Sequence, residues 1–347
     1  MLQTPIAITL GDAAGIGPEI IAKAYRLQPE LLAGCLVWGD VQAMRRATKL
    51  LNQGAVPQPM ARIVSPKEVW AVPPGCIPVL QEGSPLPEVV MGQVSALAGA
   101  FAGNCVFSAA RAAMRGEISA IVTAPLHKEA LSAAGAPFNQ FPGHTEMLQA
   151  VAAEHLSLPV NEVPVRMMLA NEELRTVLVS IHVSLRAAID AVTFDNVLQT
   201  LLITHVSLTK VLGRAPRIAV AGLNPHAGEG GLFGWEERDI IVPAMQAAAA
   251  KGCRVSGPWA PDTVFMRARN EQGHESEFDV VVAMYHDQGL IPVKYLGVEK
   301  GVNVTLGLPL VRTSPDHGTA FDIAGSGSAD PSSLIEAIRM ARALLTS

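Results

Sequence analysis

The chain has little that would mark it as secreted, disulfide-bonded or inserted in a membrane. Its four cysteines lie far apart and form no Cys-x-x-Cys pair, which argues against a disulfide framework and a zinc knuckle. The N-terminus lacks the charged start and the cleavage site of a signal peptide. The apolar run near residues 95–110 is interrupted by polar side chains, so it predicts a buried helix and no membrane span. We therefore expect a cytoplasmic protein.

Charged and aromatic residues are also scarce, at 16% and 5% of the 347 residues. With a net charge of -5, the chain lacks the basic surface that binding to a nucleic acid needs. Hydrophobic residues make up 49% of the chain, which is ample for a large core, and the length favours two domains. This composition is typical of an α/β enzyme in which helices pack closely on a sheet.

Short apolar segments alternate with longer amphipathic ones along the chain. Strands are expected at 6–10, 36–40, 61–64, 77–80, 120–123, 165–170, 174–179, 217–221 and 280–284. Helices are expected near 91–115, 185–212, 236–250 and 331–345. Strands that alternate with helices in this way predict an α/β fold.

Three histidines occupy similar positions after predicted strands. His182 follows an apolar strand directly, His226 follows the strand at 217–221 after a short turn, and His286 follows the strand at 280–284. Ligands of open α/β sheets bind at the carboxyl ends of strands. Three histidines around one ion leave coordination positions open for substrate, which is the catalytic arrangement of zinc and related ions. A hydrogen-bonded structural role remains the alternative for each histidine.

Two further segments have the composition of binding sites. The turn at 11–17 is rich in glycine, but its spacing matches neither the dinucleotide fingerprint nor the phosphate-binding P-loop. The segment at 141–148 opens a helix, and Thr145 is a plausible N-cap there. Free N–H groups at a helix N-terminus bind anions, so this is a candidate anion site. A simple cap beside a surface histidine is the alternative.

These motifs occur together, and in order, in a known family. The segments GDxxGIGPE, TAPLHK, GHTE, LNPHAGEGG, PDTVF, YHDQG and FDIAG lie in this order between residues 11 and 325, and the resemblance extends over residues 5 to about 340. They resemble the 4-hydroxythreonine-4-phosphate dehydrogenase (PdxA) family. The resemblance implies two α/β/α domains with a cleft between them, as in isocitrate and isopropylmalate dehydrogenases, and not a Rossmann fold. It implies a cofactor-side domain of residues 1–130 plus 300–347, and a domain of residues 131–299 that carries most metal ligands and the dimer interface.

The resemblance also implies an activity. Family members oxidise and decarboxylate 4-phosphohydroxy-L-threonine to 3-amino-2-oxopropyl phosphate in pyridoxal 5'-phosphate biosynthesis, using a divalent metal and NAD or NADP. They are homodimers with the active site at the subunit boundary. Close relatives act on D-threonate or D-erythronate 4-phosphate, and another branch oxidises the cis-dihydrodiol of terephthalate. A metal-dependent hydrolase or acyltransferase and a non-enzymatic small-anion binding protein are the remaining alternatives.

The resemblance assigns roles to individual residues of this chain. The metal ligands are His182, His226 and His286, with zinc favoured and cobalt or magnesium as alternatives. The substrate contacts are His144, Thr145, Lys294, Asn303 and Arg312. The cofactor contacts are Asn224, Gly228, Gly230, His317, Gly318 and Thr319. Apart from the resemblance, we name Lys294, Asp287 and Asp262 as candidates for proton transfer, and the sequence does not choose among them. The cationic side chains favour a phosphorylated substrate, because lysine and arginine bind phosphate through charge-assisted hydrogen bonds.

Overall fold

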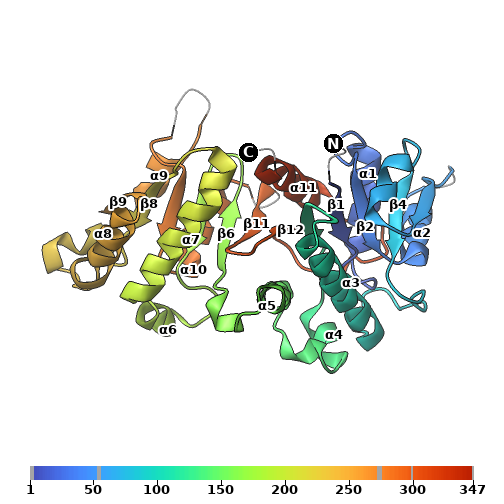
Figure 1. Ribbon diagram of the computed structural model, residues 1–347, viewed down its shortest axis with the longest axis horizontal. Helices are drawn as coiled ribbons and strands as arrows, with labels where there is room; N and C mark the ends of the chain where they lie inside the picture. The colour runs from blue at the N-terminus through green and yellow to red at the C-terminus, as the bar shows by residue number, and fades with distance from the viewer. Residues whose placement is uncertain (1–3, 53–55, 272–275, 298–299, 346–347) are drawn as a thin grey trace. The chain divides into compact units, whose positions relative to one another are not determined.

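The structure is a computed structural model that describes residues 4–52, 56–271, 276–297 and 300–345. Its contacts divide the chain into two compact units (Figure 1). Unit 1 comprises Met1–Pro164 and Leu308–Leu345, and unit 2 comprises Val165–Gly307. The boundaries differ from those expected at 130/131 and 299/300. Residues 131–164 belong to unit 1 because helix α5 (His144–Leu156) packs on helix α3 (Ala96–Met114).

Unit 1 is built on a parallel sheet. Its strand order is β3-β4-β2-β1-β5-β12. The strands are β1 (Ile6–Thr9), β2 (Cys35–Gly39), β3 (Met60–Ile63), β4 (Ile77–Gln81), β5 (Ala120–Thr123) and β12 (Val311–Pro315). The central strands β1, β2 and β5 are buried along their whole length, as expected of a parallel sheet covered on both faces.

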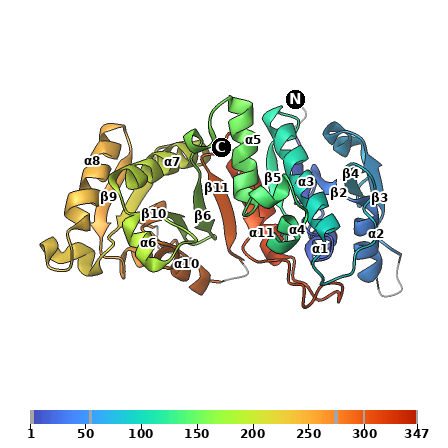
Figure 2. The same ribbon diagram turned by 90° about the horizontal axis from the view of Figure 1, so that it is seen from below.

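Two groups of helices cover this sheet (Figure 2). One group contains α1 (Gly17–Leu27), α2 (Val41–Leu50) and α11 (Ser332–Leu345). The other contains α3, α4 (Lys128–Ala133) and α5. Side-chain caps define where two of them begin, because Asp40 accepts a hydrogen bond from the backbone N of Ala43 and Ser95 accepts one from Ala98.

Unit 2 contains a mixed sheet with the order β11-β6-β7-β10-β8-β9. Its strands are β6 (Arg166–Ala170), β7 (Arg175–Leu178), β8 (Arg217–Ala221), β9 (Arg254–Trp259), β10 (Val280–Ala283) and β11 (Val302–Leu306). Its helices are α6 (Leu185–Asp190), α7 (Phe194–Leu212), α8 (Val242–Ala250), α9 (Val264–Ala268) and α10 (His286–Tyr295). Strands β7, β10, β8 and β9 run parallel to one another, so their carboxyl ends share one edge.

The α/β prediction is confirmed, and several local expectations need correction. The helix expected at 185–212 is two helices, because Oγ1 of Thr193 accepts a hydrogen bond from the backbone N of Asn196 and caps the start of α7. Strand β9 was not expected, since it contains Gly257 and Pro258; as the last strand in the order it tolerates proline. The polar turn expected at His286–Gly289 is the first turn of α10.

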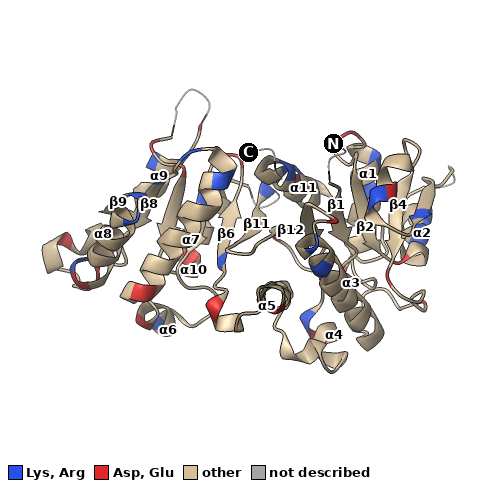
Figure 3. Cartoon of the chain, in the orientation of Figure 1, with Lys and Arg blue, Asp and Glu red and all other residues tan. Residues whose placement is uncertain are grey.

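Both signs of charge occur in each unit (Figure 3). All four cysteines are free thiols, and the sequence had argued against a disulfide framework. Among the described residues, no helix is long and apolar enough to cross a membrane.

Candidate functional site

The three histidines predicted as metal ligands follow neighbouring parallel strands of unit 2. His182 comes after β7, His286 directly opens α10 after β10, and His226 lies in the turn after β8. Strand β10 pairs with β7 on one side and with β8 on the other. The three side chains therefore start from the same edge of one sheet, as the strand-end pattern predicted.

Two of these histidines lie together. The ring centroids of His182 and His286 are 5.6 Å apart. Nδ1 of His286 lies 2.7 Å from Oδ1 of Asp287. A carboxylate on one ring nitrogen leaves the other nitrogen for a metal, which is the usual support for a metal-binding histidine. Among residues 4–52, 56–271, 276–297 and 300–345, no three histidine, cysteine or acidic side chains form a metal-binding group. This pair is thus a partial donor set.

His226 lies in an unusual left-handed turn, Pro225–Gly231. Six successive residues, 226–231, have positive φ, and three of them are not glycine: His226 at 52°, Ala227 at 53° and Glu229 at 41°. Each such residue costs about 1 kcal/mol or more, so the surrounding structure must hold the turn. Strain of this kind gathers at functional sites. Gly228 and Gly230, predicted to contact the cofactor, lie in this same turn at φ 78° and 65°.

The buried carboxylate of Glu237 holds the start of this turn. Its Oε1 accepts hydrogen bonds from the backbone N of Leu223 and Asn224 at 2.8 and 2.7 Å. Its Oε2 accepts one from the Asn224 amide at 3.0 Å. The Asn224 side chain, predicted to contact the cofactor, is therefore engaged within the turn. Sequence reasoning missed Glu237, because a glutamate at a helix start has no local feature that reveals a partner thirteen residues earlier.

Gln288 was also missed, although it lies inside the YHDQG motif. Its Oε1 accepts a hydrogen bond from the backbone N of Met284 at 2.7 Å, and its Nε2 donates one to the carbonyl of Gly222 at 2.8 Å. Gly222 follows β8 and Met284 follows β10. The amide therefore ties the two strand ends from which His226 and His286 emerge.

Unit 1 contains a second site around a buried arginine. Arg312 on β12 is 4% exposed, and its Nε and Nη2 donate to Oγ1 of Thr123 on β5 at 3.2 and 2.8 Å. Burial lowers the pKa of Arg312 to about 10, against the opposing charge of Glu146 in α5. The guanidinium remains a cation at neutral pH. A buried, oriented cation of this kind is a binding group for phosphate or carboxylate.

His144 lies beside this arginine. Burial, reinforced by the charges of Arg312 and Lys128, lowers the pKa of His144, while a hydrogen bond to the backbone of Ala124 opposes the shift. Nε2 of His144 is buried and has no hydrogen-bond partner. The bond to Ala124 therefore uses Nδ1, and neutral His144 presents an Nε2 lone pair. A buried nitrogen without a partner points to a bound hydroxyl or water.

The remaining substrate residues lie in regular structure. Thr145 is in the first turn of α5, which begins at His144, so Thr145 is not the expected N-cap; Gly143 takes that position. Lys294 is in the last turn of α10, Asn303 is on β11 and Arg312 is on β12. Strands β11 and β12 were not among the strands expected from the sequence. His144, Thr145 and Arg312 belong to unit 1, and Lys294 and Asn303 belong to unit 2.

The last predicted residues lie at the ends of loops. His317 and Gly318 are exposed after β12, and Thr319 is buried against Gly15 of the glycine-rich turn, where its carbonyl accepts a hydrogen bond from the backbone N of Ile16 at 3.1 Å. Asp262 is exposed between β9 and α9. The glycine-rich turn, which matched no dinucleotide motif, thus packs directly on the predicted cofactor segment.

Comparison with known proteins places the chain among enzymes. The model of the PdxA family, described as pyridoxal phosphate biosynthetic protein PdxA, matches residues 32–341. The chain is 51% identical to the 4-hydroxythreonine-4-phosphate dehydrogenase of Beijerinckia indica, covering 96% of this chain and 93% of that one. It is 44% identical to the D-threonate 4-phosphate dehydrogenase of Pectobacterium atrosepticum, covering 98% of both. The crystal structure of 4-hydroxythreonine-4-phosphate dehydrogenase from Klebsiella pneumoniae superposes with a TM-score of 0.86 at 41% identity, covering 100% of this chain and 99% of that one.

Proposed function

The chain belongs to the PdxA family of pyridoxal phosphate biosynthetic proteins, and from this premise we propose that it oxidises 4-phosphohydroxy-L-threonine. The product after decarboxylation is 3-amino-2-oxopropyl phosphate, on the route to pyridoxal 5'-phosphate. The observation that carries the proposal is the 51% identity to a 4-hydroxythreonine-4-phosphate dehydrogenase along nearly both full chains. Four free thiols suit the reducing cytoplasm, where we place the reaction.

The substrate phosphate is assigned to the helix α5 start and to Arg312. Thr145 lies in the first turn of α5, where backbone N–H groups and the helix dipole favour an anion. Arg312 supplies a buried cation that Thr123 orients. Lys294 on α10 and Asn303 on β11 are proposed as further substrate contacts. A phosphate rather than a carboxylate is favoured, because its several oxygens use both the helix N–H groups and the guanidinium.

The metal is assigned to His182, His226 and His286. The 5.6 Å between the first and third of these rings suits two ligands of one ion, and Asp287 orients His286. His226 is proposed as the third ligand, with the site at the boundary of a homodimer. The turn that carries His226 continues into the exposed apolar residues Leu232, Phe233 and Trp235, at 74%, 48% and 50% exposure, which supports a subunit contact there. Imidazole ligands favour zinc, with cobalt and magnesium as alternatives.

The nicotinamide cofactor is assigned to two segments. One is the left-handed turn with Asn224, Gly228 and Gly230. The other is His317–Thr319, whose last residue packs on the glycine-rich turn. Glycines without side chains allow a pyrophosphate to approach the backbone closely. We propose NAD, with NADP as the alternative.

The chemistry divides between the bound groups and the chain. Bound metal and dinucleotide supply Lewis acidity at the substrate hydroxyl and a hydride acceptor. Neutral His144 accepts a hydrogen bond from a substrate hydroxyl through Nε2 and so positions it. Asp287 is engaged with His286, so Lys294 is our choice to move the proton. Asp262, exposed after β9, is the secondary candidate.

One experiment separates the proposal from its rivals. Purified protein is mixed with zinc, NAD and 4-phosphohydroxy-L-threonine, and the absorbance of NADH is followed. D-Threonate 4-phosphate, D-erythronate 4-phosphate and the terephthalate cis-dihydrodiol are run in parallel. D-Threonate 4-phosphate is the strongest second candidate, because of the 44% identity to such an enzyme. A hydrolase or acyltransferase would turn over a substrate without NAD, and a small-anion binding protein would turn over none.

A further inference from the structure

The turn that carries His226 is held in its left-handed form by contacts from outside the turn. All of residues 226–231 have positive φ, including three that are not glycine. Residues with a side chain avoid this backbone region, so the turn is under strain. Without its neighbours the turn would relax toward negative φ and carry the imidazole with it. The groups that hold the turn therefore also hold the position of the His226 ring.

Glu237 is the group that reaches furthest into this turn, and it is 5% exposed. Its Oε1 accepts hydrogen bonds from the backbone N of Leu223 and Asn224, which directly precede the turn. Its Oε2 accepts one from the Asn224 amide and lies 2.7 Å from the position that a Cβ on Gly228 would take. One carboxylate thus contacts both the entry and the middle of the turn.

The chain that leaves the turn is tied to the same point. Nδ2 of Asn224 also donates to Oε2 of Glu236 at 2.7 Å. A Cβ on Gly234 would overlap this Nδ2, so the backbone packs directly on the amide. In the same way, a Cβ on Gly231 would overlap the ring of Trp235. Both ends of the turn are therefore fixed by the fold of unit 2 itself.

The start of the turn is also connected to His286. The amide of Gln288 accepts a hydrogen bond from the backbone N of Met284 and donates one to the carbonyl of Gly222. Gly222 comes directly before the two N–H groups that Glu237 holds, and Oε1 of Glu237 lies 3.1 Å from the position of a Cβ there. The strand end that Glu237 fixes is thus the one that Gln288 ties to the strand end of His286.

The backbone around Glu237 is unusual. This residue begins a π-helical turn, Glu237–Ile241, in which the backbone N of Val242 donates to the carbonyl of Glu237 five residues earlier. The π-helical turn packs on the turn of His226. Such turns are rare and occur frequently at functional sites. The departure from an ordinary α-helix begins at the residue whose side chain holds the His226 turn, which indicates a role beyond helix formation.

We propose that Glu237 is a positioning residue for His226, which holds the strained turn so that the imidazole is already in place when the metal binds. The inference rests on the proposed metal ligand and adds the group that positions it. A carboxylate suits this place because three N–H groups point at it and it has no donor of its own. Glutamine would place its NH₂ group against one of these donors and leave that donor unsatisfied.

The first measurement is the affinity for zinc, determined by competition with a chromogenic chelator in the absence of substrate and NAD. Groups that orient a metal ligand typically account for about 10- to 100-fold in metal affinity. Glu237→Gln should therefore bind zinc about 10- to 100-fold more weakly than the parent protein.

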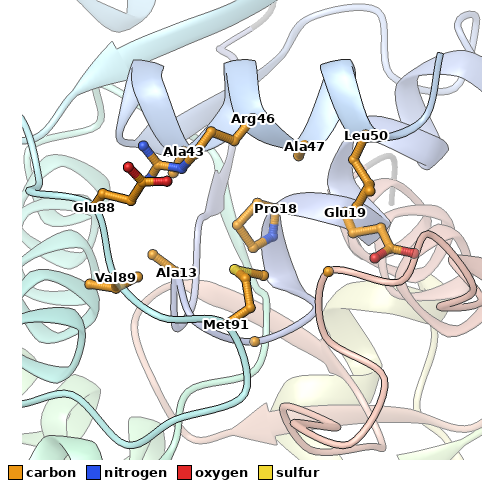
Figure 4. A pocket seen from close by; sticks show the side chains of 12 residues that line it. Ala13, Pro18, Glu19, Ala43, Arg46, Ala47, Leu50, Glu88, Val89 and Met91 are labelled. Carbon is orange, nitrogen blue, oxygen red and sulfur yellow. The ribbon is translucent and has the colours of Figure 1, made fainter. Parts of the chain in front are cut away.

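Glu19→Gln is the matched control. Glu19 on α1 is also a buried glutamate, 3% exposed, and it accepts hydrogen bonds from the backbone N of Ala329 and Gly327 at 2.8 and 3.3 Å. It pairs with Lys23 and lies with Pro18 in the lining of an apolar pocket beside α2 (Figure 4). All of these residues belong to unit 1, whereas the three histidines belong to unit 2. Glu19→Gln should therefore keep the zinc affinity of the parent.

A double-mutant cycle with His226→Asn tests whether Glu237 acts through the histidine. Asparagine tolerates the left-handed backbone, so the turn can persist without the ring. If Glu237 acts by placing the imidazole, Glu237→Gln should cause no further loss of zinc affinity in the His226→Asn background. A further loss of about 10- to 100-fold in that background would mean that Glu237 acts independently of His226, and it would overturn the inference.

Amide hydrogen exchange of the metal-free protein tests the same contacts without zinc. The N–H groups of Leu223 and Asn224 lose their acceptor in Glu237→Gln if the amide turns its NH₂ group toward them or the side chain moves away. We expect these two groups to exchange at least tenfold faster than in the parent, and at the parent rate in Glu19→Gln. Unchanged exchange in Glu237→Gln would show that the carboxylate does not hold the turn.

The remaining outcomes separate this inference from the proposed metal ligand. If Glu237→Gln does not fold, as judged by its thermal melting, Gly228→Ala replaces it, because the added Cβ would press on Oε2 of Glu237; a smaller loss of zinc affinity is then expected. Zinc binding that His226→Asn weakens and a folded Glu237→Gln does not would overturn the inference alone. Zinc binding that His226→Asn leaves unchanged would count against the ligand role and, with it, against the inference.

Discussion

Replacing Arg312 with methionine tests the proposed phosphate site most directly. Methionine keeps the length and apolar character of the arginine stem, so the change mainly removes the guanidinium from a position that is 4% exposed. In the structure Nε and Nη2 of that group donate to Oγ1 of Thr123. If Arg312 binds the phosphate, the variant should lose affinity for phosphorylated substrates and keep its affinity for unphosphorylated ones.

The magnitude follows from the kind of bond that is lost. A hydrogen bond to a charged group contributes about 1.5–3 kcal/mol, and a guanidinium offers phosphate two of them. Taking about 3 kcal/mol for the pair gives a decrease in kcat/KM of roughly 100-fold, at 1.36 kcal/mol for each factor of ten. Thr123 loses its donor in the variant, so the free energy of unfolding should fall by about 1–3 kcal/mol.

Arg166 offers a matched control. Its Nε donates to Oγ1 of Thr200 at 2.7 Å, which reproduces the arginine–threonine bond of the proposed site, but it was not predicted to contact substrate. Arg166→Met should therefore cost similar stability and leave kcat/KM unchanged. The assay is NADH formation with 4-phosphohydroxy-L-threonine and with 4-hydroxy-L-threonine, beside urea unfolding of each protein. An equal loss on both substrates, or an equal loss in the two variants, would refute the assignment.

Three further predictions concern stability, pH and the metal. Burial acts to raise the pKa of Asp279, but hydrogen bonds from two arginines outweigh it and leave the pKa below its usual value. Asp279→Asn should therefore lower the free energy of unfolding by about 2 kcal/mol at pH 7. That difference should shrink as the pH falls below about 4, whereas Asp239→Asn, in a fully exposed pair, should leave urea unfolding unchanged. Burial lowers the pKa of His144, so the unfolded chain binds a proton there first and stability should drop as the pH falls below about 6.5. His144→Gln should flatten this drop in stability, whereas the exposed control His155→Gln should keep it. If the curve of stability against pH for His144→Gln is identical to those of the parent and of His155→Gln, the reasoning is contradicted. Asparagine tolerates the left-handed backbone found at position 226, so His226→Asn should keep the thermal midpoint of the parent protein. The variant should lose more than about 100-fold in kcat. An unchanged zinc content after dialysis would rule out the ligand role.

The predicted domain boundaries show how far local signals reach. The segment around His144 was assigned with the histidines of the other domain, because a sequence shows the order of elements and not which helix packs on which. The structure packs α5 on α3, so His144 and Thr145 share unit 1 with Arg312. That packing brings the helix N-terminus and the buried cation into one compact unit, which strengthens the phosphate assignment.

The amino-acid sequence alone determined the α/β fold, most strand positions and the placement of His182, His226 and His286 after strands. These features follow from local rules: the period of apolar residues, the residues that cap helices and the glycines that open turns. The motifs also led to the family, because each preserves a short contiguous stretch. Strand β9 was missed because these rules are local, and Gly257 and Pro258 are unfavourable residues in a strand.

Only the tertiary structure decided which of these residues meet. The bond between Arg312 and Thr123 joins positions 189 residues apart, and it exists because β12 lies next to β5 in the sheet. The approach of His182 to His286 depends in the same way on the pairing of β7 with β10. The apolar pocket beside α2 arises from four separate segments and has no motif of its own. Such contacts follow from strand order and helix packing, which no local pattern of residues encodes.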